Sequence, residues 1–325
     1  MKKRIFSGIQ PTGSIHIGNY LGAIKNWSKL QDEYDAIFCI VDLHALTNPK
    51  MAHQMQQKIF DLSTTLLAAG LNPKKCLIFT QSQVPEHTEL TWLLNTITPI
   101  AELERMTQFK EKAKQFRQNI NMGLFDYPVL MTADILLYQT DTVPVGEDQR
   151  QHVELSRIIA RKFNNQFGKT FVIPEPLIYK SGARIMSLTD PTKKMSKSLP
   201  QSYLSITDSP TLIKDKIKKA VTDSGREIEY TPKKPAIANL ITIYHCFSGL
   251  SFDQIEKKYK NKGYAQFKDD LAKVIIKGLK PFQEKKKALE QKPAYVKKIL
   301  DQGAKKAQAI AQKTLKQVKQ KMGLV

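Results

Sequence analysis

The chain has 325 residues and a formal net charge of +21, with 51 Lys and Arg against 30 Asp and Glu. Its 41% apolar and 25% charged residues exclude a wholly disordered or collagen-like protein, and the length suggests two domains. No run approaches the ~18 consecutive apolar residues of a membrane span, and three distant cysteines fit neither a disulfide framework nor a zinc site. We therefore expect a cytoplasmic protein with no membrane association. The positive field attracts polyanions such as nucleic acid, although a lysine-rich solubilising surface has the same composition.

The first half of the chain alternates between strand and helix patterns. The apolar runs at 36–41 and 76–80 are typical of strands buried on both faces, and helical spacing separates them. The expected strands are 4–6, 36–41, 76–80, 143–145 and 171–173, and the expected helices are 18–30, 51–69, 90–118, 127–138 and 149–163. This order predicts an α/β fold with a Rossmann-like parallel sheet and right-handed crossovers.

The composition changes near residue 188. Residues 189–210 are rich in Pro, Ser, Thr and Lys, which indicates a loop followed by a linker. Helical patterns return at 211–221, 236–246, 252–259 and 263–277, and a lysine-rich tail follows over 281–325. The tail has twelve lysines against three acidic residues, and its apolar spacing lets one face dock while the other stays positive. We expect a Rossmann-like catalytic domain at 1–188 and a mostly α-helical region at 189–325.

The loop after the first strand is the first candidate for nucleotide binding. It reads Gln10-Pro11-Thr12-Gly13-Ser14-Ile15-His16-Ile17-Gly18-Asn19. Open α/β sheets bind ligands beyond the carboxyl ends of their strands. Gly18 lets a purine or ribose lie against the backbone, and His16 and Asn19 can donate hydrogen bonds to phosphate oxygens. A helix N-terminus with a surface histidine has the same local pattern.

The second candidate is the loop Lys194-Met195-Ser196-Lys197-Ser198. Ammonium groups on long side chains can follow charge as it moves onto a phosphate group, and the serine hydroxyls add donors. A solvated basic loop has the same composition when it is taken alone. The two loops together are very unlikely by chance, whereas the absence of GxGxxG and GxxxxGK[ST] leaves a dinucleotide fold and a Walker-type NTPase unsupported.

The pair of loops resembles the class I aminoacyl-tRNA synthetases, with HIGN standing for their HIGH motif. A closer resemblance to the tryptophanyl branch extends from Phe6 to Ser224, and Asn19 in place of the second histidine is usual there. The stretches that carry it are FSGIQPTGSIHIGNYLGAI, FCIVDLHALT, ELERMTQFKEK, ADILLYQTDTVPVGEDQRQH, GARIMSLTDPTKKMSKS and AVTDS. The resemblance implies ATP and L-tryptophan as substrates, Mg²⁺ bridging the ATP phosphates, tRNA(Trp) as partner, a helical anticodon-recognition region and a homodimer.

The resemblance also implies a two-step reaction. The tryptophan carboxylate attacks the α-phosphorus of ATP, pyrophosphate leaves, and the tryptophanyl group passes to the 3′ end of the tRNA. Such catalysis is positioning and charge stabilisation, so no protein nucleophile and no metal cage of protein ligands are required. The family's catalytic positions match His16, Asn19, Lys194, Ser196 and Lys197. Its ATP-binding positions match Gln10, Pro11, Thr12, Gly18, Asn19, Gly146, Glu147, Asp148, Ile185, Lys194, Met195, Ser196, Lys197 and Ser198.

Selection of indole needs one buried acceptor within an apolar shell, because indole has a single N–H donor and no acceptor. Asp134 in the stretch MTADILLY aligns with the family's indole-binding aspartate, although taken alone it is more often a helix residue paired with a neighbour. His44 is equally well a pocket wall or a buried histidine with internal partners. Tyr127 and Gln149 are expected to hold the substrate ammonium with Gln10. The expected tryptophan-binding residues are Phe6, Gln10, Val41, His44, Tyr127, Met131, Asp134, Val143 and Gln149, with Val145 as a further apolar wall.

Three other functions remain open at this point. A tyrosyl-specific enzyme of the same fold differs only in the branch-specific stretches and in the context of Asp134. A small-molecule nucleotidyltransferase would share the first loop but would not need the basic helical region. A non-enzymatic RNA-binding protein would not need Lys194 and Lys197. The stretch Trp92–Ile100, followed by Glu102–Arg105, fits a subunit interface as well as a core segment.

Overall fold

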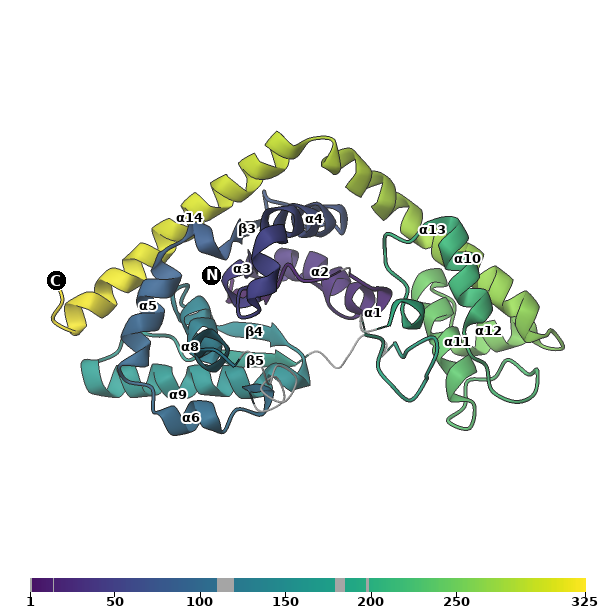
Figure 1. Ribbon diagram of the computed structural model, residues 1–325, viewed down its shortest axis with the longest axis horizontal. Helices are drawn as coiled ribbons and strands as arrows, with labels where there is room; N and C mark the ends of the chain where they lie inside the picture. The colour runs from purple at the N-terminus through teal and green to yellow at the C-terminus, as the bar shows by residue number, and fades with distance from the viewer. Residues whose placement is uncertain (1, 14, 110–119, 179–184, 197–198) are drawn as a thin grey trace.

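The structure is a computed structural model that describes residues 2–13, 15–109, 120–178, 185–196 and 199–325. A parallel sheet in the order β3-β2-β1-β4-β5 forms the centre of the first half, as the alternating sequence predicts (Figure 1). Its strands are β1 Arg4–Ile9, β2 Asp35–Ile40, β3 Cys76–Thr80, β4 Thr142–Val145 and β5 Glu175–Ile178. The strand order reverses between β1 and β4, and a crevice at such a reversal is where open sheets bind ligands.

The two faces of the sheet bury different side chains because successive residues of a strand point to opposite sides. Phe6, Ile37 and Cys39 belong to one apolar cluster, and Ile5 and Phe38 belong to another. The first cluster is covered by α5 Glu86–Asn95, α8 Met122–Leu136 and α9 Arg150–Phe167, and the second by α2 Lys25–Glu33 and α4 Met55–Ala68. Helices therefore cover both faces of the sheet, and the expected α/β fold is confirmed.

Short helical segments connect these elements and set the loops at the carboxyl edge of the sheet. They are α1 Ile17–Asn19, the π-helical turn η1 Tyr20–Ile24, α3 Asp42–Ala45, η2 Pro49–Gln54, η3 Gln81–Gln83, α6 Ile100–Glu104 and η4 Glu147–Gln149. The helix expected at 18–30 is thus interrupted by η1, and the expected helix at 90–118 divides between α5 and α6. Its end at 110–119 lies outside the described residues.

The strand expected at 171–173 is wrong, because the last strand is β5 at Glu175–Ile178. Asn164 and Gln139 bind the backbone of residues 170–172 through side-chain hydrogen bonds, so this segment forms a loop. Pro176 lies within β5, where proline disfavours a strand because it has no N–H to donate. A proline is tolerated because β5 is an edge strand of the sheet.

The second half is a helical region with its own core. Its elements are η5 Pro200–Ser202, α10 Pro210–Lys219, α11 Pro235–Ser248, α12 Phe252–Tyr259 and α13 Tyr264–Glu290. Ile17 and Leu21, which belong to the HIGN segment and its extension, are buried in this core, so the two halves meet at the first candidate loop. Among the helices described, none combines the length and the apolar character that crossing a membrane requires.

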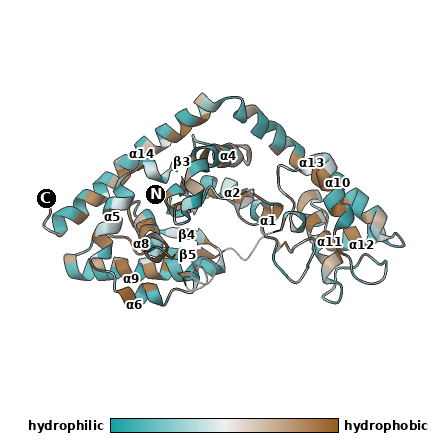
Figure 2. Ribbon diagram, viewed as in Figure 1, coloured by the Kyte–Doolittle hydropathy of each residue, from teal (hydrophilic) through white to brown (hydrophobic). Residues whose placement is uncertain are grey.

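The last helix, α14 Pro293–Lys321, returns to the sheet instead of packing within the helical region (Figure 1). It lies against β3, where a Cβ on Gly303 would sit 2.0 Å from the carbonyl oxygen of Ile78. Hydrophobic and polar residues alternate along α14 in Figure 2, and the buried side includes Ala304, Ala307 and Ala311. The helix covers the open edge of the sheet, which would otherwise expose unpaired backbone groups. The apolar spacing of the tail predicts that one face docks but does not indicate the sheet as the place where it docks.

Candidate active site

A cavity of about 1140 Å³ opens at the carboxyl ends of β1 and β4, where the strand order reverses. Its walls include Gln10 after β1, Gly146 after β4, and Lys194 from the segment 185–196. Ligand pockets for one drug-sized molecule measure ~300–1,000 Å³, so this cavity has room for two substrates of moderate size. One end reaches the buried core beside Asp134, and the other reaches the candidate nucleotide loops.

The HIGN segment is held by a reciprocal cap at the start of α1. The His16 ring accepts a hydrogen bond at Nδ1 from the backbone N–H of Asn19 (3.3 Å), and the Asn19 side-chain oxygen accepts from the backbone N–H of His16 (3.5 Å). Because Nδ1 accepts, the ring proton is on Nε2. The ring lies 3.0 Å from where a Cβ of Gly18 would be, so a larger residue would displace it.

Backbone hydrogen bonds connect the HIGN segment to the chain that follows the KMSKS loop. Ile17 N–H donates to Leu204 at 2.9 Å, and Ile206 N–H donates to Ile15 at 3.1 Å. Upstream, Met195 N–H donates to Ile185 at 3.1 Å, and a β-bridge joins Met186 to Lys194. These contacts bring Lys194, Met195 and Ser196 to the wall of the cavity that contains His16. Lys197 and Ser198 lie outside the described residues.

The turn after β4 adds an acidic rim. An Asp148 carboxylate oxygen lies 2.7 Å from where a Cβ of Gly146 would be, so a larger residue there would push this exposed carboxylate away from the turn. Gln149 donates from Nε2 to Asp148 at 2.9 Å. Exposed Glu147 and Asp148 carboxylates at the mouth of the cavity are suited to accept hydrogen bonds from sugar hydroxyls.

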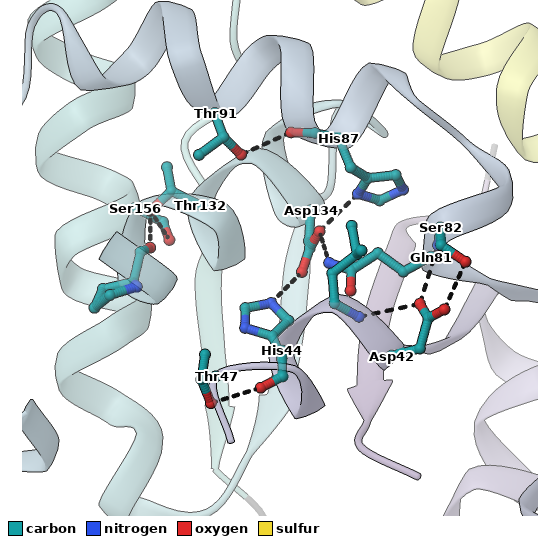
Figure 3. A network of polar contacts seen from close by, with 12 residues as sticks. Asp42, His44, Thr47, Gln81, Ser82, His87, Thr91, Thr132, Asp134 and Ser156 are labelled. Atoms are coloured by element: carbon teal, nitrogen blue, oxygen red, sulfur yellow. Dashed lines mark hydrogen bonds and ion pairs between the residues drawn. The ribbon is translucent and has the colours of Figure 1, made fainter. Parts of the chain in front are cut away.

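Asp134 lies at the buried end of the cavity and accepts three hydrogen bonds (Figure 3). Its Oδ2 accepts from His44 Nε2 at 2.8 Å, and its Oδ1 accepts from His87 Nδ1 and Gln81 Nε2, each at 2.6 Å. Burial alone would raise the pKa of Asp134, but the hydrogen bonds from His44 and His87 outweigh it and lower the pKa below the usual carboxyl range. The core therefore contains an ionised, acceptor-only group.

A second aspartate fixes the positions of two of these donors. Asp42, directly after Val41 at the end of β2, accepts from the backbone N–H of Ser82 at 3.0 Å and from the Ser82 hydroxyl at 2.5 Å (Figure 3). The contact joins the ends of β2 and β3. It places Gln81, the neighbour of Ser82, and His44, two residues after Asp42, on the same side of the sheet edge.

The family model for class I tRNA synthetases (W and Y) matches residues 1–280. The chain is 51% identical over 327 residues to a tryptophan–tRNA ligase of Wolinella succinogenes, with 100% of each chain covered. It is 53% identical to that of Caldanaerobacter subterraneus, with 99% of each covered. The chain belongs to the class I tRNA synthetases of the W and Y family.

A solved member of this synthetase family agrees with the fold of the whole chain. The tryptophanyl-tRNA synthetase of Campylobacter jejuni, solved in complex with ADP and tryptophan, superimposes with a TM-score of 0.88. It is 36% identical, and the match covers 99% of this chain and 100% of the other. Membership of the family excludes the two more distant functions left open by the sequence, a small-molecule nucleotidyltransferase and a non-enzymatic RNA-binding protein.

Most residues that the sequence singled out meet at this synthetase cavity. The lining includes Phe6, Gln10, His16, Gly18, Asn19, Val41, His44, Tyr127, Met131, Asp134, Val143, Val145, Gly146, Glu147, Asp148, Gln149, Ile185, Lys194, Met195 and Ser196. Pro11 and Thr12 lie in the same loop but do not line the cavity, so their contact with ATP stays a prediction. The assignment of individual roles to the lining residues is likewise a proposal.

Two of the residues expected to bind tryptophan, Tyr127 and His44, have hydrogen-bond partners within the protein. The Tyr127 hydroxyl hydrogen-bonds to His152 Nε2 at 2.9 Å, and burial raises the pKa of Tyr127, so this group remains a neutral phenol. His44 combines both of the alternatives that the sequence left open, since it lines the cavity and also has an internal partner in Asp134.

Sequence reasoning missed the residues that support the site from behind. His87 and Gln81 bind Asp134 but stand outside every motif considered, and an isolated histidine at the start of a helix carries no signal of its own. Gln108 lines the cavity and lies within ELERMTQFKEK, a stretch that was recognised but not assigned a role. Gly8 was also missed, although a Cβ there would sit 2.9 Å from the Val41 side chain.

Proposed function

We propose that this chain is a tryptophan–tRNA ligase that forms tryptophanyl-adenylate from L-tryptophan and ATP and then charges tRNA(Trp). One observation carries the proposal. A single cavity has a buried, ionised acceptor, Asp134, at one end and His16 with Lys194 at the other. The first end suits a flat apolar group with one N–H donor, and the second suits a triphosphate.

The indole end selects the side chain of the amino acid. Phe6, Val41 and Val143 are buried apolar walls beside Asp134. Phenylalanine would fill the walls but would offer no donor to Asp134, and a site built around a hydrogen bond discriminates strongly against a ligand that lacks it. The proposed contacts of Gln10, Tyr127 and Gln149 with the substrate ammonium place the carboxylate toward the nucleotide loops.

The nucleotide end performs the chemistry. A tryptophan carboxylate oxygen forms a bond to the α-phosphorus of ATP while the bond to the bridging oxygen breaks, and pyrophosphate leaves with the electron pair. His16 and Asn19 hold phosphate oxygens, and Lys194, with Lys197 from outside the described residues, neutralises the charge that develops on the leaving group. In the second step a ribose hydroxyl of the tRNA attacks the tryptophanyl carbonyl, and AMP leaves.

Mg²⁺ enters as part of the MgATP substrate. Among the described residues there is no group of three or more His, Cys, Asp or Glu placed to hold a metal ion. Mg²⁺ commonly keeps waters and binds through substrate phosphates, so a dedicated set of protein ligands is not needed. When bound, the ion offsets negative charge on the phosphates.

Amino-acid-dependent exchange of labelled pyrophosphate into ATP tests the proposed substrate. The protein is incubated with MgATP, labelled pyrophosphate and each amino acid in turn. We expect exchange with tryptophan and background rates with phenylalanine and tyrosine. Exchange driven by tyrosine and not by tryptophan would instead identify the tyrosyl-specific enzyme, the alternative that shares this fold.

The proposed tRNA partner accounts for the charge of the helical region. The exposed lysines of α10, α12 and α13 can neutralise phosphates, and each neutralised phosphate makes binding more sensitive to salt. We expect aminoacylation to weaken with salt far more than pyrophosphate exchange does, which parallel titrations of both activities can measure. Equal salt sensitivity would place the tRNA surface elsewhere.

We propose the cytoplasm, the place of translation, as the location, where Cys39, Cys76 and Cys246 would stay reduced.

We also propose a homodimer, for which the surface around α5 is the best candidate. Trp92, Ile100 and Met122 are 70%, 65% and 73% exposed, which is high for large apolar side chains. Trp92 lines a groove of about 440 Å³ together with Tyr127, Asn121 and Gly123, the last two being the neighbours of Met122 in the chain. Light scattering should give twice the 37.0 kDa chain mass, and Trp92→Glu should shift it toward one chain. A monomeric wild-type protein would overturn this proposal.

A further inference from the structure

The two oxygens of the Asp134 carboxylate have different hydrogen-bonding environments. Oδ1 accepts from both His87 Nδ1 and Gln81 Nε2, whereas Oδ2 accepts only from His44 Nε2 among the described residues (Figure 3). A carboxylate has about four acceptor positions, two on each oxygen. Oδ1 is therefore filled, and one acceptor position remains on Oδ2. His44 lines the cavity together with Asp134, while His87 and Gln81 do not.

His87 is held so that it must donate to Asp134. Its Nε2 lies 2.8 Å from the Tyr138 hydroxyl, and its ring is fully buried. Because the Asp134 carboxylate can only accept, the Nδ1 atom that faces it carries a proton. Burial, with Cys39 and Asp134 nearby, raises the pKa of Tyr138 well above its ordinary value, so the hydroxyl keeps its proton and can donate to the other ring nitrogen, Nε2. The Tyr138 ring itself stacks on Phe6 at 5.5 Å, which fixes the far end of this chain of hydrogen bonds.

The orientation of the Gln81 side-chain amide leaves one buried polar atom without a partner among the described residues. Its Nε2 donates to Asp134, and its Oε1 is buried without a hydrogen-bond partner among the described residues. A buried unsatisfied acceptor is destabilising. The opposite orientation of the amide would place its oxygen against the carboxylate, so Asp134 determines which way the amide faces. The Asp42–Ser82 contact fixes the backbone next to Gln81.

We propose that His87 and Gln81 are positioning residues for indole recognition, which fill Oδ1 of Asp134 and leave Oδ2, beside His44, as the single acceptor for the indole N–H. The inference rests on the proposed function, because it requires tryptophan as the substrate. Neither residue touches the substrate. They act through the orientation of the carboxylate, which would otherwise rotate and present either oxygen to the cavity.

Substitution of His87 with two amides separates the roles of its two nitrogens. The amide nitrogen of Asn occupies the place of Nδ1, whereas the amide of Gln reaches the place of Nε2. The readout is the preference in pyrophosphate exchange for tryptophan over 3-(3-benzothienyl)alanine, a close isostere that has sulfur in place of the indole N–H. This ratio isolates the contribution of the donor.

We expect His87→Phe and His87→Gln to raise the KM for tryptophan about tenfold, with kcat nearly unchanged, and to reduce the preference by a similar factor, as for loss of one hydrogen bond to a charged group. His87→Asn should restore most of the preference. Gln81→Met removes the second donor together with the unpartnered oxygen, so it should lower the preference without lowering the melting temperature. Thr91→Val on the same helix, where the hydroxyl donates to the backbone carbonyl of His87 and to no other described residue, is the matched control and should keep the wild-type ratio.

If His87→Phe, His87→Gln and Gln81→Met lose equal amounts of exchange activity with tryptophan and with the benzothienyl analogue, the role of these residues is purely structural and the inference is overturned. A wild-type ratio in all three would overturn it as well. If His87→Phe does not fold, Gln81→Met, His87→Asn and His87→Gln still distinguish a positioning role from a purely structural one. Failure of the wild-type protein to exchange with tryptophan would instead overturn the proposed function, and this outcome is visible before any variant is made.

Discussion

The two ends of the cavity are built in different ways. At the indole end, Asp134, His44 and His87 are 1%, 5% and 0% exposed, and each has a fixed hydrogen-bond partner. At the nucleotide end, Glu147 and Lys194 are exposed, and much of the geometry comes from backbone contacts between loops. Buried hydrogen bonds are strong and barely screened by salt, whereas exposed charges are screened and mobile. Selection of the amino acid and activation of ATP should therefore respond separately to mutation.

The largest expected effect is at the nucleotide end. Lys197→Ala should lower kcat for pyrophosphate exchange by roughly 10²–10³, the usual loss when one stabilising charge is removed from a transition state. The affinity for tryptophan in the absence of ATP should not change. Rapid-quench measurement of adenylate formation checks the rate.

A neighbouring lysine is the control for this experiment. Lys193 is exposed and pairs with Asp190 at 2.9 Å, so Lys193→Ala removes the same charge from the same segment. Its rate should stay close to that of the wild type. If both variants lose activity equally, the effect comes from the general positive field and not from a positioned group.

The second effect is at the indole end. Asp134→Asn keeps the size of the side chain but presents N–H groups where His44, His87 and Gln81 already donate. The KM for tryptophan should rise about 10–100-fold, since hydrogen bonds to a buried charge are lost, while the KM for ATP stays the same. Steady-state exchange kinetics with each substrate varied in turn measure both. A similar rise in the KM for ATP would mean that the two ends are not separable.

Sequence reasoning predicted the nucleotide end more completely than the support of the indole end. HIGN is one continuous stretch of sequence, and so is the acidic turn after β4, so the residues within each of them can be recognised together. The partners of Asp134 come from three separate elements, since His44, Gln81 and His87 follow β2, β3 and a turn, and only folding brings them together. The last strand, β5, is difficult to predict because Pro176 has no N–H to donate to a strand ladder. The return of α14 to the sheet brings Gly303 against the backbone of Ile78, a close contact that no periodic pattern reveals.

A substitution at Gly303 should change the stability of the protein without affecting either end of the cavity. A Cβ at residue 303 would overlap the carbonyl oxygen of Ile78, and a backbone atom in the sheet cannot move aside. Gly303→Ala should lower the free energy of unfolding by about 1–3 kcal/mol, the typical cost of overpacking. Denaturant unfolding measures the loss, and the KM values for both substrates in the folded protein should not change. Gly263→Ala, where no atom lies within 4 Å of the added carbon, should cost less.

The smallest effect is on the pH dependence of stability. The folded pKa of Asp134 lies below the unfolded value of about 4, so its contribution to stability is complete above that pH and is lost as the pH falls further. Melting temperatures of the wild type should therefore drop more steeply below pH ~4 than those of Asp134→Asn. Parallel slopes would mean that the carboxylate gains nothing from its three donors.

Calorimetric titration of tryptophan without ATP tests the separation of the two ends most directly. The wild type, Lys197→Ala and Asp134→Asn are compared under one set of conditions. The two-ended cavity predicts the same Kd for the wild type and Lys197→Ala, and a Kd at least about tenfold weaker for Asp134→Asn. Equal weakening in both variants, or none in Asp134→Asn, would contradict it.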